Sequence, residues 1–442
     1  MTTTKDISDS TVISGWGGYP LQKARVLKPS SLSNYKSYLQ QNACLIARGM
    51  GRSYGDSANA STVLQTSYYD HFVAFDVATG LLTVEAGVML REILKITVKH
   101  GWFLPVTPGT SFVTLGGAIA SDVHGKNHHA NGTFGQHVIS MSILLGTGEV
   151  VSASPTLLPD LFYATCGGMG LTGVIVQATI QLIPIQSAFI HQKTLKAGSL
   201  EEAFDAFEVC SSSAYSVAWI DCLTTGKHLG RSVLMLGEHS DRGGLDFKIK
   251  HPISVPIYTP ASLLNGMTMK AFNAAYWTKA SHNKTQTISM LPYFYPLDAI
   301  GGWNKLYGKA GFVQYQFVLP KTGGLANMRL IITQIAQSGQ GSFLAVLKEF
   351  GPSNKNLLSF PLEGYTLALD FKMSQSTIAL LHRLDDMVVG MGGRVYLTKD
   401  AVMRELSFKS TYPRWQEFEF IRQKYRAIGK FASAQSKRLG LA

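Results

Sequence analysis

A glycine-rich loop directly after an apolar run constrains the fold of this chain most, within NACLIARGMGRSYGDSA at residues 42–58. Gly49, Gly51 and Gly55 allow the backbone to adopt positive φ angles and to approach a ligand closely. Successive N–H groups in such a loop form a concave site for anions. Arg48 and Arg52 add positive charge and forked hydrogen-bond donors. The loop therefore predicts a binding site for a diphosphate.

Three other interpretations of the loop compete with this one. A dinucleotide fingerprint, G-x-G-x-x-G, should open a helix, but Tyr54 stands at the third glycine position and the following SANAST run is a poor helix former. The same residues spell the nucleophile elbow G-x-S-x-G, which would make Ser53 the nucleophile of a serine hydrolase, yet that motif also requires a helix after the loop. An ordinary surface turn would leave the two arginines without a role.

The composition is that of a globular protein with an anionic partner. The 442 residues are 45% hydrophobic, enough for two or three domains with buried cores. A net charge of +12 favours a partner such as a nucleotide phosphate, a nucleic acid or an acidic lipid surface. Only 15% of residues are charged, and no block of Lys or Arg occurs before the last 40 positions, so we expect no nucleic-acid partner.

Cysteine usage and hydropathy indicate a cytoplasmic setting. The cysteines at 44, 166, 210 and 222 form no C-x-x-C pair and no metal-like spacing. The N-terminus has no apolar core of a signal peptide. The longest span without charge, 161–192, is interrupted by glycines and Pro184 and alternates like a strand, so we predict no membrane-spanning helix there.

The chain divides into three parts by composition and periodicity. We expect a first domain over 1–184, a second α+β domain with an antiparallel sheet over 185–393, and a helical segment over 394–442 that returns to the first domain. The elements expected with the clearest patterns are strands at 73–76, 81–87, 215–221, 312–320 and 365–371, helices at 89–100 and 376–393, and a hairpin turn at 146–148.

One segment, 251–269, stands apart from these patterns. It carries three prolines, several aliphatic side chains and no charged residue, and Lys248, Lys250 and Lys270 flank it. Three prolines prevent a continuous helix. We expect a mobile loop with an apolar face and basic flanks that contacts lipid, or else a plain connecting loop.

Three glycine-rich segments together resemble the FAD-binding domain, of PCMH type, of the vanillyl-alcohol-oxidase superfamily: RGMGRSYGD, PGTSFVTLGGAIASDVHGKNHH and ATCGGMGLTGVI. The resemblance extends over nearly the whole chain. The segments HGKNHH, FYPLD, GWNKLYGKAGFVQYQFVLP, RVYLTKD and TYPRW are similar to the decaprenylphosphoryl-β-D-ribose 2′-oxidase family. This implies an α+β, two-domain flavoprotein with a FAD-binding domain and a substrate domain built on an antiparallel sheet.

The resemblance also implies which residues hold FAD. Many superfamily members attach FAD covalently through a histidine in the first loop, where this chain has Arg52, so we expect non-covalent FAD. The residues that match the family's cofactor site lie in the first loop, in the second glycine segment and at two later positions. They are Ala47, Arg48, Gly49, Met50, Gly51, Arg52, Ser53, Tyr54, Gly55, Asp56 and Ser57; Gly109, Thr114, Leu115, Gly116, Gly117, Ser121, Asp122, Val123 and His124; and Ile175 and Tyr396.

Three residues match the family's catalytic positions: Lys399, His124 and Tyr54. Lys399 would meet the substrate beside the flavin, and burial would lower its pKa; the alternative is a solvated lysine next to Asp400. A metal site at His124, His128 and His129 is not expected, because Gly125 and Asn127 disfavour the helix that would align two of them and no carboxylate follows at a useful spacing.

The substrate side of the family's pocket is matched by a polar set. Gln314 and Gln316 are two apart on one predicted strand and would face the same side. Tyr295 and Trp219 have core packing as the alternative. The set expected to contact substrate is Lys126, Tyr295, Asn304, Gln314, Gln316 and Lys399.

The resemblance implies oxidation of the 2′-hydroxyl of polyprenylphosphoryl-β-D-ribose to the 2′-keto sugar, the first step of epimerisation to an arabinose donor for the cell wall. It further implies a short-chain reductase partner, a quinone as electron acceptor, and peripheral association with the inner membrane, the side undetermined. Mycobacterial members carry Cys where this chain has Ala368, so the polyprenyl length and the pentose stay open. The alternatives are an aldonolactone or alditol oxidase of the same superfamily and a serine hydrolase using Ser53.

Overall fold

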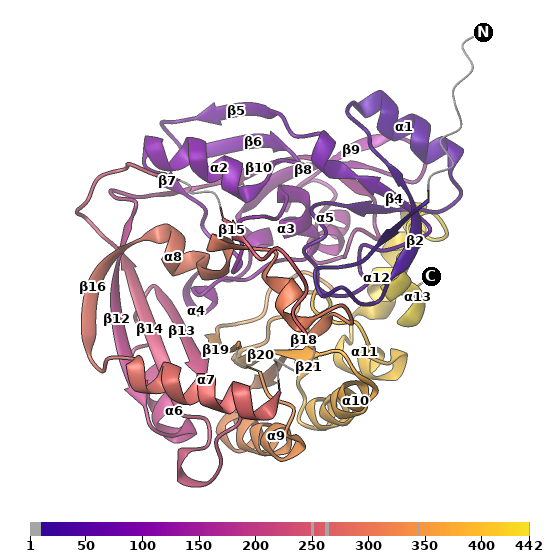
Figure 1. Ribbon diagram of the computed structural model, residues 1–442. Helices are drawn as coiled ribbons and strands as arrows, with labels where there is room; N and C mark the ends of the chain where they lie inside the picture. Colours follow the sequence, from indigo (N-terminus) through magenta and orange to yellow (C-terminus); the bar gives the residue numbers. More distant parts are fainter. Residues whose placement is uncertain (1–9, 249–251, 261–264, 343, 442) are drawn as a thin grey trace.

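The computed structural model describes residues 10–248, 252–260, 265–342 and 344–441, whose main-chain ribbons are drawn in Figure 1. The first sheet has the strand order β1-β2-β4-β3, in which β2, β4 and β3 are parallel and β1 is antiparallel to β2. Ser31 caps the helix that crosses between β2 and β3 by accepting a hydrogen bond from Asn34 N–H. The elements are β1 Thr11–Ile13, β2 Gln22–Leu27, α1 Leu32–Gln41, β3 Ile46–Arg48 and β4 Thr62–Gln65.

A second sheet of five antiparallel strands, in the order β5-β6-β10-β8-β9, lies beside the first in Figure 1. The first of its helices, α2, buries Leu90, Ile93 and Leu94, and its helical segment ends where Gly101 adopts φ 79°. The elements are β5 Phe72–Asp76, β6 Leu81–Glu85, α2 Leu90–Thr97, β7 Trp102–Phe103, α3 Leu115–Ala120, α4 His128–Asn131, β8 Val138–Leu144, β9 Val150–Ala153, α5 Pro159–Thr165, β10 Val174–Gln181 and β11 Ile183–Pro184.

The third sheet has eight antiparallel strands in the order β16-β12-β14-β13-β19-β20-β18-β21. Apolar side chains of α6, α9 and α10 form one core with one face of this sheet. The elements are β12 Phe189–Ala197, α6 Leu200–Val209, β13 Tyr215–Ile220, β14 Ser232–His239, β15 Ile253–Ser254, α7 Gly266–Lys279, β16 Lys284–Ser289, α8 Met290–Phe294, β17 Ile300–Gly301, β18 Phe312–Pro320, α9 Gly324–Ser338, β19 Ala345–Phe350, β20 Gly364–Lys372, α10 Gln375–Gly390 and β21 Arg394–Val395.

The chain then returns to the first sheet, and of the described helices that follow β21 the last two lie beside β2 in Figure 1. A bridge joins Phe431 to Leu45 just before β3, and Arg438 forms an ion pair with Asp56 in the glycine-rich loop. These helices are α11 Glu405–Thr411, α12 Trp415–Lys424 and α13 Ala434–Arg438. The short 3₁₀ helices are η1 Thr66–Tyr68, η2 Val98–His100, η3 Phe134–His137, η4 Gly226–His228, η5 Pro296–Ala299 and η6 Trp303–Tyr307.

The predicted fold class, α+β with an antiparallel sheet in the second part of the chain, is confirmed. In the segment 251–269, residues 251 and 261–264 lie outside the described residues, and helix α7 begins at Gly266 under an Asn265 cap. This helix starts after the last of the three prolines, so no proline interrupts it. No helix among the described residues is long and apolar enough to cross a membrane.

Candidate active site

The glycine-rich loop connects β3 to β4 without a helix, so neither the dinucleotide fingerprint nor the nucleophile elbow has the helix it requires. Gly51 adopts φ 62°, a conformation that glycine adopts without strain. Within the described chain, no hydrogen bond takes up the backbone N–H groups of residues 50–53. Unpaired donors on consecutive residues are suited to a bound anion, so this loop fits the diphosphate of FAD.

The second glycine-rich segment lies directly against the first. A Cβ on Gly49 would lie 2.4 Å from Thr114 Oγ1, so only glycine fits at that contact. Thr114 caps α3 by accepting a hydrogen bond from Gly117 N–H, and Gly116 packs on Ala86. A Cβ on Gly109 would have nothing within 4 Å. The two segments that the sequence assigns to FAD are thus contiguous in space.

The charged residues in these segments have protein partners. Arg48 donates to the carbonyls of Ser14 and Ala58 and to Asn59 Oδ1, which closes the loop on itself. Arg52 lies with its Cζ 3.8 Å from the ring centroid of Trp16. Asp122 accepts hydrogen bonds from the side chains of Asn354, Asn356 and Ser359 and from Gly135 N–H.

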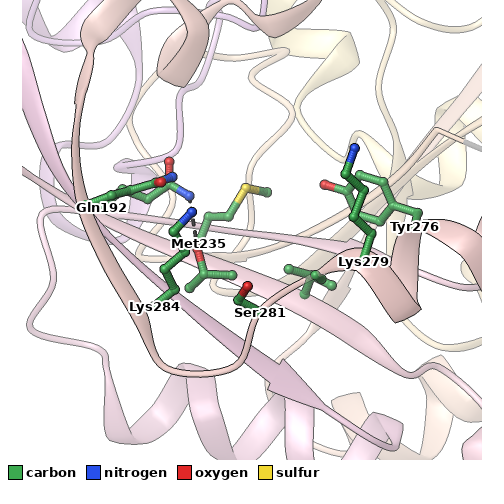
Figure 2. A pocket seen from close by; sticks show the side chains of 10 residues that line it. Gln192, Met235, Tyr276, Lys279, Ser281 and Lys284 are labelled. Carbon is green, nitrogen blue, oxygen red and sulfur yellow. Dashed lines mark hydrogen bonds between the residues drawn. The ribbon is translucent and has the colours of Figure 1, made fainter.

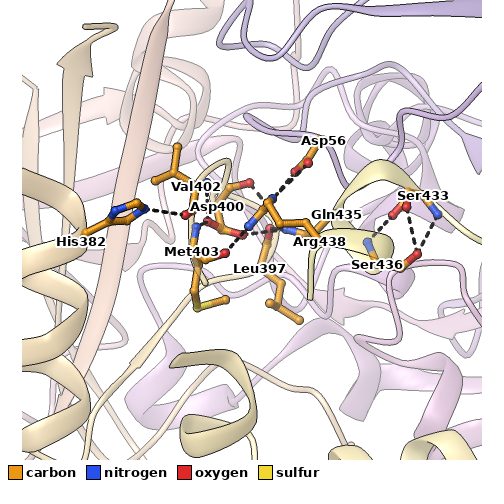
Figure 3. Close-up of polar contacts among 10 residues, drawn as sticks. All are labelled: Asp56, His382, Leu397, Asp400, Val402, Met403, Ser433, Gln435, Ser436 and Arg438. Carbon is orange, nitrogen blue, oxygen red and sulfur yellow. Dashed lines mark hydrogen bonds and ion pairs between the residues drawn. The ribbon is translucent and has the colours of Figure 1, made fainter. Parts of the chain in front are cut away.

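The C-terminal helix α13 anchors the turn that carries Lys399 (Figure 3). Arg438 bridges Asp56 Oδ1 at 2.7 Å and Asp400 Oδ2 at 2.9 Å, and Gln435 Nε2 donates to the Leu397 carbonyl at 2.7 Å. Tyr54 N–H donates to the Thr398 carbonyl at 2.9 Å. The glycine-rich loop and the Lys399 turn are therefore held together by a buried ion-pair network and by a backbone hydrogen bond.

The other wall of the site is one face of the eight-stranded sheet. Residues directly opposite on neighbouring strands share a face, and each strand alternates faces. Gln314 is opposite Asp370, Gln316 is opposite Ala368, and Lys348 is opposite Thr366. The intervening residues, such as Leu347, Leu367 and Leu369, pack with the helices on the other face. As predicted, Gln314 and Gln316 face the same side.

Lys399, Tyr54 and Asp370 meet where this face approaches the glycine-rich loop. Lys399 Nζ lies 3.9 Å from the centroid of the Tyr54 ring. Asp370, which is 1% exposed, accepts hydrogen bonds from Gln314 Nε2 at 2.6 Å and from the Tyr307 hydroxyl at 3.2 Å. Burial lowers the pKa of Lys399 to about 7 and raises that of Asp370 to about 7, although each charge favours ionisation of the other. Burial also raises the pKa of Tyr54. Near neutral pH, the Lys399 amine can therefore exchange a proton.

His124 is a buried, oriented ring in the same region. Gln316 Nε2 donates to His124 Nε2 at 2.9 Å, so the ring proton belongs on Nδ1, which has no partner within the described residues. Burial holds the pKa of His124 well below its usual value. The ring is a neutral donor at Nδ1, packed against Phe350 and Tyr396.

The remaining predicted residues fall into different surroundings. Lys126 donates to the Tyr293 carbonyl, and its Nζ lies 4.1 Å from the centre of the Tyr293 ring. Tyr295 lies in the core of the second sheet, where its hydroxyl is 2.6 Å from Thr107 Oγ1, and Asn304 donates to the Trp16 carbonyl. The other positions named for FAD also have defined places: Ile175 pairs with Ile143 between β10 and β8, and Tyr396 donates its hydroxyl to the Ser121 carbonyl.

Sequence reasoning missed three polar residues of this region: Asp370, Tyr307 and Lys348. Asp370 and Lys348 interrupt the apolar runs YTLALDF and AVLKEF. A single charge on the inward face of an apolar strand is the signal that could have located both residues. Tyr307 ends a short 3₁₀ helix and carries no comparable signal.

A cavity elsewhere in the fold lies between α7 and strands β12, β14 and β16 (Figure 2). Its volume is about 230 Å³, and Gln192, Met235, Tyr276, Lys279 and Lys284 are among the residues that line it. None of the residues predicted from the sequence as catalytic or cofactor-binding lines this cavity.

The comparisons with known proteins agree with this geometry. The FAD binding domain family matches residues 32–154, which include the first two of the three glycine-rich segments. The chain is 37% identical to decaprenylphosphoryl-beta-D-ribose oxidase of Mycolicibacterium smegmatis over the full length of both chains, and 29% identical, over 80% of its length, to the whole of an uncharacterized protein in the mprA 5′ region of Streptomyces coelicolor. L-gulonolactone oxidase of Bos taurus is 28% identical over 40% of this chain and 41% of its own. The chain is a FAD-dependent oxidoreductase and belongs to the decaprenylphosphoryl-β-D-ribose oxidase family.

Proposed function

We propose that this protein oxidises the 2′-hydroxyl of a polyprenylphosphoryl-β-D-ribose to the 2′-keto sugar. The observation that carries the proposal is the Lys399, Tyr54 and Asp370 cluster beside the glycine-rich loop, in a chain that matches the M. smegmatis relative from end to end. The aldonolactone oxidases match less than half of the chain.

The reaction removes a hydride from the carbinol carbon and a proton from its hydroxyl, which leaves a C=O bond. When bound by the two glycine-rich segments, FAD would supply the two-electron oxidising capacity that this reaction needs. Lys399 Nζ accepts the hydroxyl proton, because at neutral pH a substantial fraction of this amine is uncharged. The negative charge of Asp370 would stabilise the ammonium that results, and the Tyr54 ring limits the positions the amine can occupy.

The test is anaerobic mixing of the purified holoprotein with farnesylphosphoryl-β-D-ribose, followed by the bleaching of its flavin absorbance. We expect bleaching with this substrate and none with L-gulono-1,4-lactone or an alditol. Bleaching with the lactone or alditol alone would assign the chain to the rival oxidase class. A colourless protein whose Ser53 reacts with a fluorophosphonate would support the serine hydrolase instead.

The FAD in this proposal is bound without a covalent link. The support is Arg52, whose guanidinium is stacked on Trp16 in the first loop and offers no nucleophilic nitrogen comparable to imidazole. Precipitating the protein with acid should release all of the flavin into the supernatant. Flavin that remains in the pellet would contradict this part of the proposal.

The proposal includes peripheral contact with the inner membrane. Ile253, Ile257 and Ile300 are 84%, 70% and 42% exposed on strands β15 and β17 and the adjoining segment. Lys305 Nζ donates to the Val255 carbonyl, and the η6 helix that carries Lys305 contributes Trp303 to the aromatic cluster against which Tyr54 packs. An exposed apolar patch at this place would bring the site to a lipid-linked substrate. Replacing Ile257 with Asp should reduce co-sedimentation with anionic liposomes, and unchanged binding would exclude this patch.

Two partners complete the proposed pathway step. The keto sugar needs a reductase of the short-chain class to finish the epimerisation, and a membrane quinone would reoxidise the flavin. Adding a soluble quinone such as menadione should restore the flavin absorbance after substrate has bleached it. Recovery that requires oxygen, and that menadione does not accelerate, would exclude the quinone.

A further inference from the structure

Two lysines beside the proposed reacting centre lie on adjoining segments, within electrostatic range of each other, and have no acidic partner among the described residues. Lys126 is in the turn before α4, and Lys348 is on β19. The turn and the strand are packed together, because Gly351 N–H donates to His128 Nδ1 at 3.2 Å and His124 and His128 both pack against Phe350. Neither lysine forms an ion pair with a carboxylate of the described residues.

The groups that face this pair are all basic or neutral. His124 and His128 come from the same turn as Lys126, Thr366 is opposite Lys348 on β20, and Lys399 approaches from the turn after β21. The neighbouring Glu349 points to the other face of the sheet, where it pairs with Lys321. Burial lowers the pKa of Lys126 to about 7, with the charge of Lys348 as a further cause, and burial lowers the pKa of Lys348 to about 8. The Tyr293 carbonyl and ring, which contact Lys126 Nζ, are also neutral, so neither lysine has a counter-charge within the described chain, and a bound anion would stabilise both ammonium forms.

The position of the pair relative to Lys399 identifies the anion. On β20, Thr366 precedes Asp370 by four residues, about 13 Å at 3.3 Å per residue. The charge of Lys348 nevertheless lowers the pKa of Lys399, so the two amines are within electrostatic range of each other. In a ribose 1-phosphodiester, the phosphate and the 2′-hydroxyl are on adjacent carbons, so the cations that hold the phosphate must lie close to the residue that takes the proton without occupying its place.

We propose that Lys126 and Lys348 form the subsite for the phosphodiester of the lipid-linked sugar. This inference rests on the proposed function for its substrate, and it adds Lys348 and a role for Lys126. The two ammonium groups hold the singly charged phosphodiester between the turn at 124–129 and β19. His124 and Gln316 separate this subsite from Asp370 and its partners.

The test compares Lys348→Gln with the wild type by calorimetric titration with farnesyl phosphate, which carries the lipid phosphate and no sugar. We expect a 10- to 100-fold larger Kd in the variant, and a similar rise in KM for farnesylphosphoryl-β-D-ribose with kcat changed less than about threefold. Lys348→Arg, which keeps the charge, should restore most of the affinity. In the wild type at pH 8, binding should also take up protons, measured as a dependence of the heat on the buffer.

The matched control is Lys321→Gln, which removes the same charge from the opposite face of the same sheet. It should leave both constants unchanged. An unchanged Kd in Lys348→Gln overturns the inference, as does inorganic phosphate that binds as tightly as farnesyl phosphate, which would assign the pair to free phosphate. If farnesyl phosphate binds through Lys348 but the ribose substrate leaves the flavin oxidised, the subsite stands and the proposed function fails.

Discussion

One wall of the site consists mainly of main-chain atoms, and the other consists mainly of side chains. The glycine-rich wall is made of backbone: the N–H groups of residues 50–53 have no hydrogen-bond acceptor in the part of the chain that the structure describes, and close contacts leave no space for a Cβ at Gly49 or Gly55. The wall on the sheet is made of side chains, since Gln314, Gln316, Lys348 and Asp370 are brought to one face by strand register. The first wall therefore tolerates few added atoms, whereas the second is sensitive to changes of charge.

The strongest test of this contrast is Gly55→Ala. The added Cβ would lie 1.9 Å from the Asp400 carbonyl oxygen and 2.9 Å from Ala401 Cα, and both are backbone atoms that cannot rotate away. We expect the glycine loop and the Lys399 turn to separate, at a cost of about 3 kcal/mol or more in the free energy of unfolding, with loss of bound FAD. Chemical denaturation and the flavin-to-protein absorbance ratio measure these effects.

Gly390→Ala is the control for that variant, because its Cβ would have nothing within 4 Å. It should keep its flavin and its stability. A Gly55→Ala protein that retains a full complement of FAD would contradict the idea that backbone contact defines this wall.

On the other wall, Lys399→Met should keep its flavin and lose the chemistry. The methionine side chain fills a similar volume but accepts no proton, so flavin reduction by farnesylphosphoryl-β-D-ribose should slow by about 10³-fold. Stopped-flow absorbance measures the rate, and unchanged flavin content shows that the cofactor wall is intact. Reduction at the wild-type rate would remove Lys399 from the proposed mechanism.

The same contrast explains how much the sequence can predict. Backbone-built sites leave a local pattern of glycines, so the loop at 49–55 and the segment that begins at Gly109 are recognisable from the sequence alone. The pairing of Gln314 with Asp370, 56 residues apart, depends on the register of β18 and β20, which periodicity alone does not determine. Lys399 and His124 are identified by resemblance, and the network that anchors the Lys399 turn through Arg438 leaves no local signal.

Arg438 joins the glycine-rich loop to the Lys399 turn through Asp56 and Asp400. Arg438→Met tests how much this contact contributes to the free energy of unfolding. It would leave Asp56 and Asp400, both almost fully buried, without their shared cation, at a cost of about 3 kcal/mol of unfolding free energy at pH 7. The penalty should shrink as the pH falls, because burial raises the pKa of Asp56 and the nearby Arg438 charge, which opposes that rise, is gone. Arg414→Met, which breaks a surface pair with Glu417, should cost about 1 kcal/mol or less. Equal losses of unfolding free energy in the two variants would show that the buried Arg438 network stabilises the protein no more than a surface ion pair does.

The smallest and most diagnostic effect is expected from Asp370→Asn. In the wild type, Lys399 and Asp370 titrate together near pH 7, and flavin reduction should rise with pH through this region as the amine loses its proton. The Asp370 charge raises the pKa of Lys399, so removing it lowers that pKa and should move the rising limb to lower pH by about one to two units. Above pH 9 the amine is neutral in both proteins, and their rates should differ little.

The control for this shift is Asp385→Asn, on helix α10. Asp385 is also buried, with a pKa raised to about 8, but it accepts a hydrogen bond from Tyr315 on the helix-covered face of β18. Its removal should leave the limb in place. Equal shifts of the rising limb in both variants would mean that the pH profile reports general stability. A shift in Asp370→Asn alone would place the proton acceptor next to Asp370, on the face of the sheet that lies toward the glycine-rich wall.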